Sequence, residues 1–553
     1  MSGWRGEVLT VVAIICLAIL WGIYTLGRVP LDIHQTAWLR GDFAQVYNAW
    51  SLFTQDAGAT WLFSDRASYP LPMSFSLFDP MPLLLLLGQP VSGMAGGGQY
   101  FGYYFLACVV LQGVFGYLAV RQAVILTDSE IRAAQLRYMS VLGALIWLMM
   151  PIVTHRFLGH TALSSKWVLT LGIWALLATV YVRTPRWLLI NGGVLFLVSG
   201  FNPYLLLMVG GSGLVFVTLD ALARRAWLDS LLRITVYIIV AATGLWLFGF
   251  LSGAVAVGGY GYYSMNALGP IDANELARLL PIDVPDATGG QSFEGFNYLG
   301  LGVICLVAIA MSLLLVRSHD GSRFPYVQAL LAALAFYLLA LSTTLTVGDT
   351  KLELPIPEIA NDIVSRFRAS GRLFWMASFW LIVASVSVCV WKLGPRRASH
   401  VLTALVMVQL IDVEPFAANI RQSLAGSQRL DQLETQLVDV DTSELDALLV
   451  FPPWQCDHQG TPGGVRSYEA VGFFVTGERI ATNSFYAART PTQQWQYHCN
   501  TSDFEGSVST RYLYLVSAGV SEAYHDAFEH GFAVRPSGFD DGSVIYVPKD
   551  AIQ

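Results

Sequence analysis

The sequence is poor in charged residues, and lysine is the scarcest of them. Charged residues make up 13% of the 553 residues, whereas soluble globular domains carry about 25%. Only four lysines occur, so the basic residues are nearly all arginine. The net charge of −7 argues against nucleic acid as a partner. With 54% hydrophobic residues, this composition predicts an α-helical polytopic membrane protein.

The sequence also lacks an obvious internal repeat and a signal-peptide cleavage site. Many transporter folds are built from inverted repeats, so the missing repeat disfavours them. The apolar run 8–26 follows a single arginine, Arg5. This run is roughly 19 residues long, which is enough to cross a bilayer. No small-x-small motif follows it, so we expect a retained first membrane helix rather than a cleaved leader.

Further apolar runs predict ten more membrane helices, about eleven in all. They lie near residues 101–120, 138–154, 162–182, 188–201, 203–222, 234–254, 298–316, 324–344, 373–393 and 400–413. The apolar segment 81–88 is too short to cross alone, and we expect it to be re-entrant or to cap the first loop.

The arginines between these runs predict the orientation of the chain. Short basic connections are cytoplasmic by the positive-inside tendency. They contain Arg5; Arg121, Arg132 and Arg137; Arg183 and Arg186; Arg224, Arg225 and Arg233; Arg317 and Arg323; and Lys392, Arg396 and Arg397. The alternate connections are 27–100, 155–161, 255–297 and 345–372, and these should face outward. An odd number of spans then places residues 414–553 outside as well.

The C-terminal part has the pattern of a small soluble α/β domain. Strands are expected at Ala447–Phe451, Tyr512–Ser517 and Val544–Val547, with a helix at Ser521–His530. Cys456 and Cys499 are the only cysteines in this part. Their position allows a disulfide in an oxidising compartment, and two buried free thiols are the alternative.

Two aspartates mark the first outer loop, which spans residues 27–100. Asp42 lies in R-G-D-F-A-Q-V-Y-N-A-W, and Asp79 lies in S-L-F-D-P-M-P-L. A carboxylate near an apolar boundary is partly desolvated, which suits a general base. On this stretch alone, however, a helix cap is the favoured interpretation for Asp42, and a turn or cap before proline explains Asp79 at least as well.

Two further outer connections carry cationic side chains. The stretch P-I-V-T-H-R-F-L-G-H-T-A-L-S-S-K-W contains His155, Arg156, His160 and Lys166. The two histidines are five residues apart, unlike a helical zinc pair, so phosphate or hydroxyl contacts are favoured over a metal. Snorkelling of the two cations toward the interface is the alternative.

The stretch S-R-F-R-A-S-G-R-L-F-W contains Arg366, Arg368 and Arg372, immediately before an apolar run. Three guanidiniums around a turn that opens a helix favour an anionic ligand such as phosphate. Attraction to lipid head groups is the alternative.

A glycine-rich and aromatic segment occupies the outer connection 255–297. It reads G-G-Y-G-Y-Y-S-M-N-A-L-G-P-I-D and later G-G-Q-S-F-E-G-F-N-Y-L-G, with Tyr262, Tyr263, Asn266, Glu294 and Tyr298 as its candidate ligands. Glycine hinges with aromatics and amides suit a mobile lid over a sugar, and a plain irregular loop is the alternative. Asn202-Pro203-Tyr204 falls on the same side but is also a turn signal.

Six stretches in this order resemble the GT-C superfamily of polytopic glycosyltransferases, in particular a bacterial branch of it. They are G-D-F-A-Q-V-Y-N-A-W, F-D-P-M-P-L, H-R-F-L-G-H-T-A-L-S-S-K-W, G-Y-Y-S-M-N-A-L, E-G-F-N-Y-L-G-L-G and F-R-A-S-G-R-L-F-W, between about residues 40 and 375. The resemblance implies a GT-C-like transmembrane catalytic domain over 1–413 and a periplasmic α/β domain over 414–553, in a bacterial inner membrane.

The resemblance also implies roles for individual residues. Asp42 would be the general base of an inverting transfer, and Asp79 a second acid or the true base. The phosphate of a polyprenyl-phosphate sugar donor would be held by Arg366, Arg368, Arg372, His155, Arg156 and Lys166. Other substrate contacts would come from Gln45, His160, Tyr204, Tyr263, Asn266, Glu294 and Tyr298. Many members carry an acidic pair, but Ala44 stands where the second acid would lie, so no metal or other cofactor is expected.

The sequence therefore predicts transfer of a sugar to an acceptor hydroxyl. The acceptor is expected to be an envelope glycan of the O-antigen or lipopolysaccharide kind, a lipid-linked glycan or a protein. A transporter or flippase for lipid-linked sugars is one alternative, but it would need ionisable residues near mid-span, where this sequence has almost none. A non-catalytic envelope-assembly protein is the other.

Overall fold

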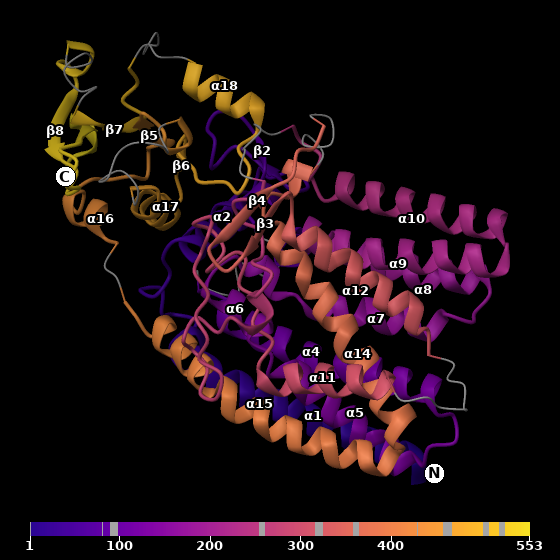
Figure 1. Ribbon diagram of the computed structural model, residues 1–553. Coiled ribbons are helices and arrows are strands. Elements are labelled where there is room, and N and C mark those ends of the chain that lie inside the picture. Colours follow the sequence, from indigo (N-terminus) through magenta and orange to yellow (C-terminus); the bar gives the residue numbers. More distant parts are fainter. Residues whose placement is uncertain are drawn as a thin grey trace.

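The structure is a computed structural model in which a bundle of helices carries a smaller sheet-containing domain at one end (Figure 1). It describes residues 2–79, 81–88, 98–253, 260–315, 324–357, 364–427, 430–456, 467–500, 508–518 and 526–553.

Every apolar run that was expected to cross the membrane coincides with a helix. The helices are α1 (Ser2–Leu26), α4 (Phe101–Thr127), α5 (Ala133–Leu148) with α6 (Pro151–His155), α7 (Trp167–Thr179), α8 (Thr184–Ser199), α9 (Pro203–Arg224), α10 (Trp227–Leu247), α11 (Leu301–Leu314), α12 (Tyr326–Leu341), α14 (Phe374–Leu393) and α15 (Pro395–Leu424). The chain is therefore a mostly helical, multi-pass membrane protein.

The expected count of eleven membrane spans rests on helix length as well as on hydrophobicity. Within the described residues, six helices are long and apolar enough to cross, or seven if the bent pair formed by α5 and the following segment counts as one span. Helices such as α7, with 13 residues, are shorter. At 1.5 Å per residue, such a helix covers about 20 Å of a hydrocarbon core that is about 30 Å thick. The count of about eleven is not confirmed.

Helix α14 forms the centre of the bundle, since 94% of its most apolar window is buried. Helices α1 and α10 lie outside, with 28% and 22% buried. An apolar helix that is enclosed on all sides belongs to a core, whereas an apolar helix with an open surface is suited to contact lipid. The core around α14 includes Trp147, Trp375 and Trp380, and the indole of Trp380 donates a hydrogen bond to Ser212 Oγ at 3.1 Å.

Helix α15 passes through the boundary that was expected after residue 413. It continues to Leu424 with Pro415 inside it. Glu414 lies within this helix and pairs with Arg278, and it accepts a hydrogen bond from the Tyr24 hydroxyl at 2.6 Å. Helix α15 therefore extends ten residues beyond residue 414.

The first outer loop folds into short elements beneath the C-terminal domain. They are η1 (Val29–Leu31), α2 (Asp42–Gln55), β1 (Phe63–Ser64), β2 (Met73–Ser74), η2 (Phe75–Phe78) and α3 (Pro82–Gly88). Helix α2 is buried along most of its length, although its sequence is more polar than the membrane helices. It is buried because it lies between the bundle and the C-terminal domain.

The C-terminal domain contains a five-stranded sheet in the order β6-β5-β7-β9-β8. Its strands are β5 (Ala447–Phe451), β6 (Ala481–Thr482), β7 (Tyr512–Val516), β8 (Phe532–Pro536) and β9 (Val544–Pro548). Strand β5 pairs in parallel with β6 and β7, and β9 pairs antiparallel with β7 and β8. The three expected strands are thus confirmed. Of the expected helix 521–530, residues 521–525 lie outside the described residues.

The remaining C-terminal elements include α16 (Gln432–Gln436), η9 (Trp454–Cys456), α17 (Ser467–Glu478) and α18 (Thr492–Asn500). A disulfide joins Cys456 to Cys499, and it links η9 to α18.

The C-terminal domain docks on the first outer loop through apolar packing and backbone pairing. Val471 and Phe474 of α17 share a buried cluster with Leu52 of α2. The backbone N–H of Thr482 donates to Arg66 O at 2.8 Å, and Tyr69 N–H donates to Thr482 O at 2.9 Å. The outer edge of β6 is therefore covered by the loop itself.

Candidate active site

Three carboxylates from distant parts of the chain meet around His160. Its Nδ1 lies 3.3 Å from Asp42 Oδ2 and 3.7 Å from Asp79 Oδ2, and its Nε2 lies 2.6 Å from Glu294 Oε1. Burial alone would lower the pKa of His160, but the Asp42 and Glu294 carboxylates outweigh it and raise the pKa to about 9. His160 is therefore an imidazolium at neutral pH, which explains why both ring nitrogens face carboxylates.

Asp42 is placed by the start of α2. The residue at the N-cap is Gly41, and no side chain caps the helix, so Asp42 does not have the capping role considered from the sequence. Gly41 adopts φ +56°, a conformation that favours glycine. A Cβ atom at Gly159 would lie 3.1 Å from Asp42 Oδ2, so a small residue at 159 leaves room for this carboxylate beside His160.

Asp79 is placed by the end of η2 and by the start of α9. It adopts φ +64°, in the left-handed region. The amide of Asn202 donates to Asp79 Oδ1 at 3.2 Å, while Asn202 Oδ1 accepts from Tyr204 N–H at 2.9 Å and so caps α9. The Asn202 side chain thus joins the N-terminus of α9 to the carboxylate of Asp79.

Glu294 is held between two guanidiniums. Arg372 binds both of its oxygens, at 2.8 Å from Nε and 2.7 Å from Nη2, and Arg156 Nη2 donates to Oε2 at 2.8 Å. Burial would raise the pKa of Glu294, but Arg156 and Arg372 hold it well below its usual range. The Arg156 guanidinium is fully buried over the rings of Phe293 and Trp375, at 4.9 and 5.4 Å. A bidentate, buried pair of this kind fixes the loop that carries Glu294.

Two arginines of this region pair with a carboxylate, and two do not. The negative charges of the three carboxylates, Asp42, Asp79 and Glu294, are balanced by the positive charges of His160, Arg156 and Arg372. Within the described ranges, no carboxylate lies within 4 Å of Arg366 or Arg368. Arg368 is half-buried over the Tyr263 ring at 5.4 Å, and Arg366 is exposed. These two side chains leave the site with positive charge that suits an anionic ligand.

Other candidates from the sequence take supporting positions near the cluster. Tyr204 packs under the Arg372 guanidinium at 4.8 Å, and its hydroxyl accepts from Ala369 N–H at 3.0 Å. Lys166 is fully buried, donates to Leu163 O at 3.1 Å and lies 4.2 Å from the Trp375 ring. His155 is buried against Phe296 and bonds Phe293 O at 3.0 Å.

Three candidates are not brought to His160 by any contact that the structure shows. Asn266 donates to Gly348 O at 2.8 Å and braces that turn. Tyr298 is buried and donates to Asp412 Oδ2 at 2.5 Å. Gln45 is buried within α2. Gly258 and Gly259 of the glycine-rich segment lie outside the described residues. In the same segment, the Tyr262 hydroxyl donates a hydrogen bond to Gly289 O at 2.9 Å.

The C-terminal domain also contributes residues near the cluster, and these were absent from the sequence-based candidates. Glu469 of α17 accepts from Gly41 N–H at 2.6 Å, directly beside Asp42. Arg489 N–H donates to Leu77 O at 3.4 Å, and the Arg489 guanidinium donates to Arg366 O. Arg372 is the nearest of the sequence-based catalytic and binding candidates, and it is 97 positions from Glu469 and 117 from Arg489, so a single sequence carries no local signal for them.

The cluster does not fit a divalent metal. In the described part of the chain, no three His, Cys, Asp or Glu side chains are arranged to hold an ion. The imidazolium of His160 occupies the position between Asp42 and Glu294 where a cation would find its oxygen ligands.

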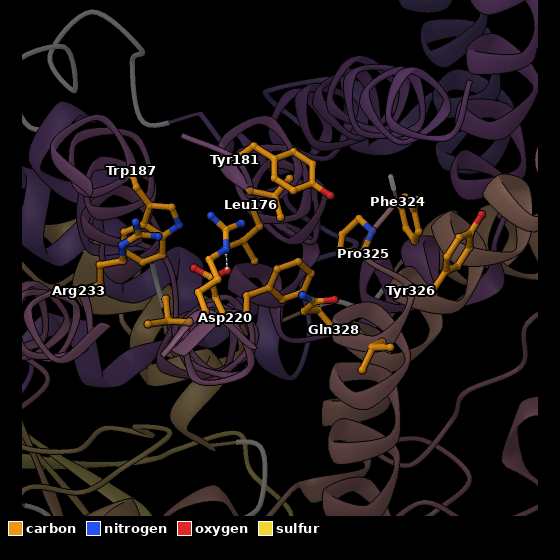
Figure 2. Close-up of a pocket in the computed structure, with 14 residues that line it drawn as sticks. Leu176, Tyr181, Trp187, Asp220, Arg233, Phe324, Pro325, Tyr326 and Gln328 are labelled. Atoms are coloured by element: carbon orange, nitrogen blue, oxygen red, sulfur yellow. Dashed lines mark ion pairs between the residues drawn. The ribbon is translucent and has the colours of Figure 1, made fainter. Parts of the chain in front are cut away.

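A second charged region lies at the far end of the same helices and encloses a cavity of about 290 Å³ (Figure 2). Figure 2 shows Trp187, Asp220 and Arg233 on one side of it and Phe324, Tyr326 and Gln328 on the other. Its ion pairs, Arg224–Asp220 at 2.5 Å and Arg233–Asp229 at 2.9 Å, are each formed within one helix. None of the site residues predicted from the sequence lines this cavity.

A family model described as a domain of unknown function, DUF6311, matches residues 14–414, and a model of the DUF6311 C-terminal domain matches residues 440–548. The chain belongs to the DUF6311 family. The first DUF6311 model includes Asp42, Asp79, His160, Glu294 and Arg372, and the second includes Glu469. No curated protein matches the sequence.

Solved structures similar to this DUF6311 chain include the transferase ArnT from Cupriavidus metallidurans in the apo state, with 12% identity, 98% of each chain covered and a TM-score of 0.48. The same protein bound to undecaprenyl phosphate gives 12% identity, the same coverage and a TM-score of 0.46. The Archaeoglobus fulgidus oligosaccharyltransferase gives 11% identity over 94% of this chain and 70% of that chain, with a TM-score of 0.43. Both proteins are GT-C superfamily members.

Proposed function

We propose that this chain is a membrane glycosyltransferase that moves a sugar from a polyprenyl-phosphate donor to an acceptor hydroxyl, with inversion. One observation carries the proposal. Asp42 and Asp79, both in the first outer loop, lie on the same side of His160 at 3.3 and 3.7 Å, and the charges of Asp42 and Arg368 both act on Tyr486. A base beside a phosphate-binding surface is the arrangement that such a displacement requires.

Asp42 is the better placed of the two carboxylates to act as the base. Its side chain is 23% exposed, compared with 14% for Asp79. Asp79 also accepts the hydrogen bond from Asn202. Asp42 takes the proton of the acceptor hydroxyl while the acceptor oxygen bonds to the anomeric carbon. The bond from that carbon to the phosphate oxygen breaks, and its electron pair leaves with the polyprenyl phosphate.

Arg368 and Arg366 receive the leaving group. The donor phosphodiester carries one negative charge, and the released phosphate gains more as the bond breaks. Guanidiniums with no carboxylate partner therefore stabilise the transition state more than the ground state, which lowers the barrier. Arg156 and Arg372 are already bound to Glu294, so they act by holding Glu294 and His160 in position.

His160 keeps the acidic residues together. Three carboxylates in one site repel one another, and one would normally take up a proton. The imidazolium lies between them and offsets that repulsion.

The arginine-rich short connections support a bacterial inner-membrane protein with its C-terminal domain and active site in the periplasm. The acceptor we propose is an envelope glycan of the O-antigen or lipopolysaccharide kind, with a lipid-linked glycan or a protein as the other candidates. A site at the membrane surface suits a donor whose polyprenyl chain stays in the bilayer.

The decisive experiment uses the purified full chain in lipid nanodiscs with a panel of undecaprenyl-phosphate sugars and envelope glycan acceptors. Asp42→Asn should lower turnover at least 100-fold, because general bases contribute about 10²–10⁴-fold. Asp79→Asn should lower it less. Asp65→Asn, in the same loop, serves as the matched control and should retain activity. Full turnover in Asp42→Asn contradicts its assignment as the base.

The structure offers little support for the transporter alternative. The buried carboxylate of α15, Asp412, is fully satisfied: it accepts from Tyr298 and from the backbone N–H groups of residues 279, 280 and 301. An acid in a transport pathway would need to exchange its partners. Flipping of a lipid-linked sugar in vesicles, without transfer from any donor, would nevertheless favour that alternative.

A further inference from the structure

Three aromatic side chains of the C-terminal domain gather beside the carboxylate cluster. Trp454 and Tyr468 have ring centroids 4.8 Å apart, Tyr468 and Tyr486 are 5.2 Å apart, and Trp454 and Tyr486 are 6.1 Å apart. All three side chains are half-buried, so each ring keeps some open surface. We call these three residues the aromatic platform.

The platform adjoins the catalytic carboxylates. Tyr468 directly precedes Glu469, whose carboxylate holds Gly41 N–H beside Asp42. Tyr486 is three residues before Arg489, which bonds Leu77 O on one side and Arg366 O on the other. The segment 486–489 therefore runs between the loop that ends at Asp79 and the arginine segment. Burial raises the pKa of Tyr486 to about 12, and the nearby charge of Asp42 adds to this, consistent with that position.

The platform is held rigidly by its own domain. Trp454 N–H donates to Ser484 Oγ at 3.0 Å. Gln455 donates to Asn483 O at 2.8 Å and accepts from Phe485 N–H at 3.2 Å. The Cys456–Cys499 disulfide starts two residues after Trp454. Because these bonds tie η9 to the 483–486 loop, the rings are positioned before any ligand arrives, which reduces the entropic cost of binding.

We propose that the aromatic platform is the acceptor subsite and that it binds a sugar ring of a glycan acceptor. This inference rests on the proposed glycosyl transfer and names the substrate class of that site. The C–H face of a pyranose is apolar and stacks on an aromatic ring, while its hydroxyls need polar partners at the edge. Tyrosine and tryptophan combine an apolar face with a polar tip, which suits a wet, half-open surface of this kind.

The geometry favours a glycan over an extended peptide. Peptides commonly bind by adding a strand to an open sheet edge. The sheet edge nearest to the site is β6, and residues 66 and 69 of the first outer loop already pair with Thr482 on that strand. The platform thus offers aromatic faces for stacking, whereas the backbone groups at the edge of β6 are already paired with the first outer loop.

The test measures binding and transfer separately on the full chain in nanodiscs. The probe for binding is the polysaccharide chain released from lipopolysaccharide by mild acid, followed by saturation-transfer NMR. Tyr486→Ala and Trp454→Ala should each weaken binding about tenfold, whereas Tyr486→Phe keeps the ring and should bind as wild type does. Tyr497→Ala, an exposed aromatic on α18 outside the platform, is the matched control. The thermal unfolding midpoint of each variant identifies one that fails to fold.

In the transfer assay, the two alanine variants should raise the acceptor KM about tenfold while the donor KM changes less than twofold. If the two alanine variants transfer the sugar with an unchanged acceptor KM, the platform is not the acceptor subsite, but the proposed glycosyl transfer still stands. Ring-dependent binding of the polysaccharide without turnover from any donor overturns the proposed function but leaves the subsite standing. Competition by a serine- and threonine-rich peptide alone, or no binding by any probe, overturns the glycan assignment.

Discussion

Two charged regions lie at opposite ends of α9, about 30 Å apart by the length of that helix. At its N-terminus, Asn202 bonds Asp79 within the His160 cluster. At its C-terminus, Arg224 pairs with Asp220 beside the cavity in Figure 2. The far ion pairs join residues one helical turn apart, whereas Glu294 is 138 residues from Arg156 and 78 from Arg372.

This difference separates charge that stabilises one helix from charge that only the tertiary fold brings together. Ion pairs within one turn form as soon as the helix does, and each contributes a few tenths of a kcal/mol. A cluster of three carboxylates and three cations forms only when the whole fold closes, and it must offset the cost of burying its charges. The cavity of about 290 Å³ lies beside ion pairs of the first kind, so a cavity by itself does not mark the proposed site.

The largest expected effect is at Glu294. Glu294→Gln keeps the size of the side chain but leaves Arg156 and Arg372 buried without a countercharge. We expect the free energy of unfolding to fall by about 3–5 kcal/mol. Denaturant unfolding of the detergent-solubilised chain, followed by tryptophan fluorescence, measures this loss. A loss below about 1 kcal/mol would mean that Glu294 contributes no more to stability than the ion pairs beside the cavity. The two charged regions would then not differ in this respect.

The next effect is a dependence on pH. The pKa of His160 is raised to about 9 in the folded chain, from 6.5. Its stabilisation is therefore complete below pH 6.5 and is lost as the pH rises through about 9, and its size is about 3 kcal/mol at most. Unfolding midpoints recorded between pH 6 and 10 should show this decline in the wild type. His160→Gln should flatten that part of the profile, and an unchanged slope would contradict the imidazolium.

Arg368 should show a smaller effect that falls on the donor. Arg368→Met keeps the apolar stem on Tyr263 and removes the charge. Loss of one charged hydrogen bond to phosphate costs about 1.5 kcal/mol, so kcat/KM for the donor should fall about tenfold, with the loss mainly in kcat. Arg224→Met, at the far end, is the matched control and should leave kcat/KM for the donor unchanged. Equal effects of the two substitutions would mean that the donor is attracted by overall charge alone.

The smallest effect is expected in the far region. Asp220→Asn breaks an ion pair within one helix, so the free energy of unfolding should change by no more than about 0.5 kcal/mol. Turnover should not change. Chemical denaturation and the transfer assay check both expectations, and a loss of turnover would show that the far region takes part in the reaction.

Hydrophobicity predicted the helices because membrane helices are long and locally encoded. It did not predict how many cross the bilayer, since helices such as α7 are apolar but only 13 residues long. Strands β5, β7 and β9 were predicted because they are buried apolar runs. Strand β6 has two residues, and β8 alternates with a polar face and ends in proline, so neither gives a strong pattern.

The candidate site was partly predictable for a different reason. Asp42, Asp79, His160 and Glu294 stood out because they are ionisable residues in outer connections of an otherwise apolar chain. The pairing of Arg372 with Glu294 was not predictable, since nothing local to either residue encodes it. For the same reason the sequence did not show that Tyr298 is bonded to Asp412, or that Glu469 lies beside Gly41.

The hydrogen bond between Gly41 and Glu469 spans 428 residues of sequence. The loop that carries Asp42 is synthesised near the beginning of the chain, and its partner near the end. A nascent chain that stops at Leu424 has its membrane helices but lacks the contacts of α17 that fix the start of α2. The order of synthesis therefore separates insertion of the protein into the membrane from completion of the proposed active site, and early truncation products should be inserted but should lack the proposed activity.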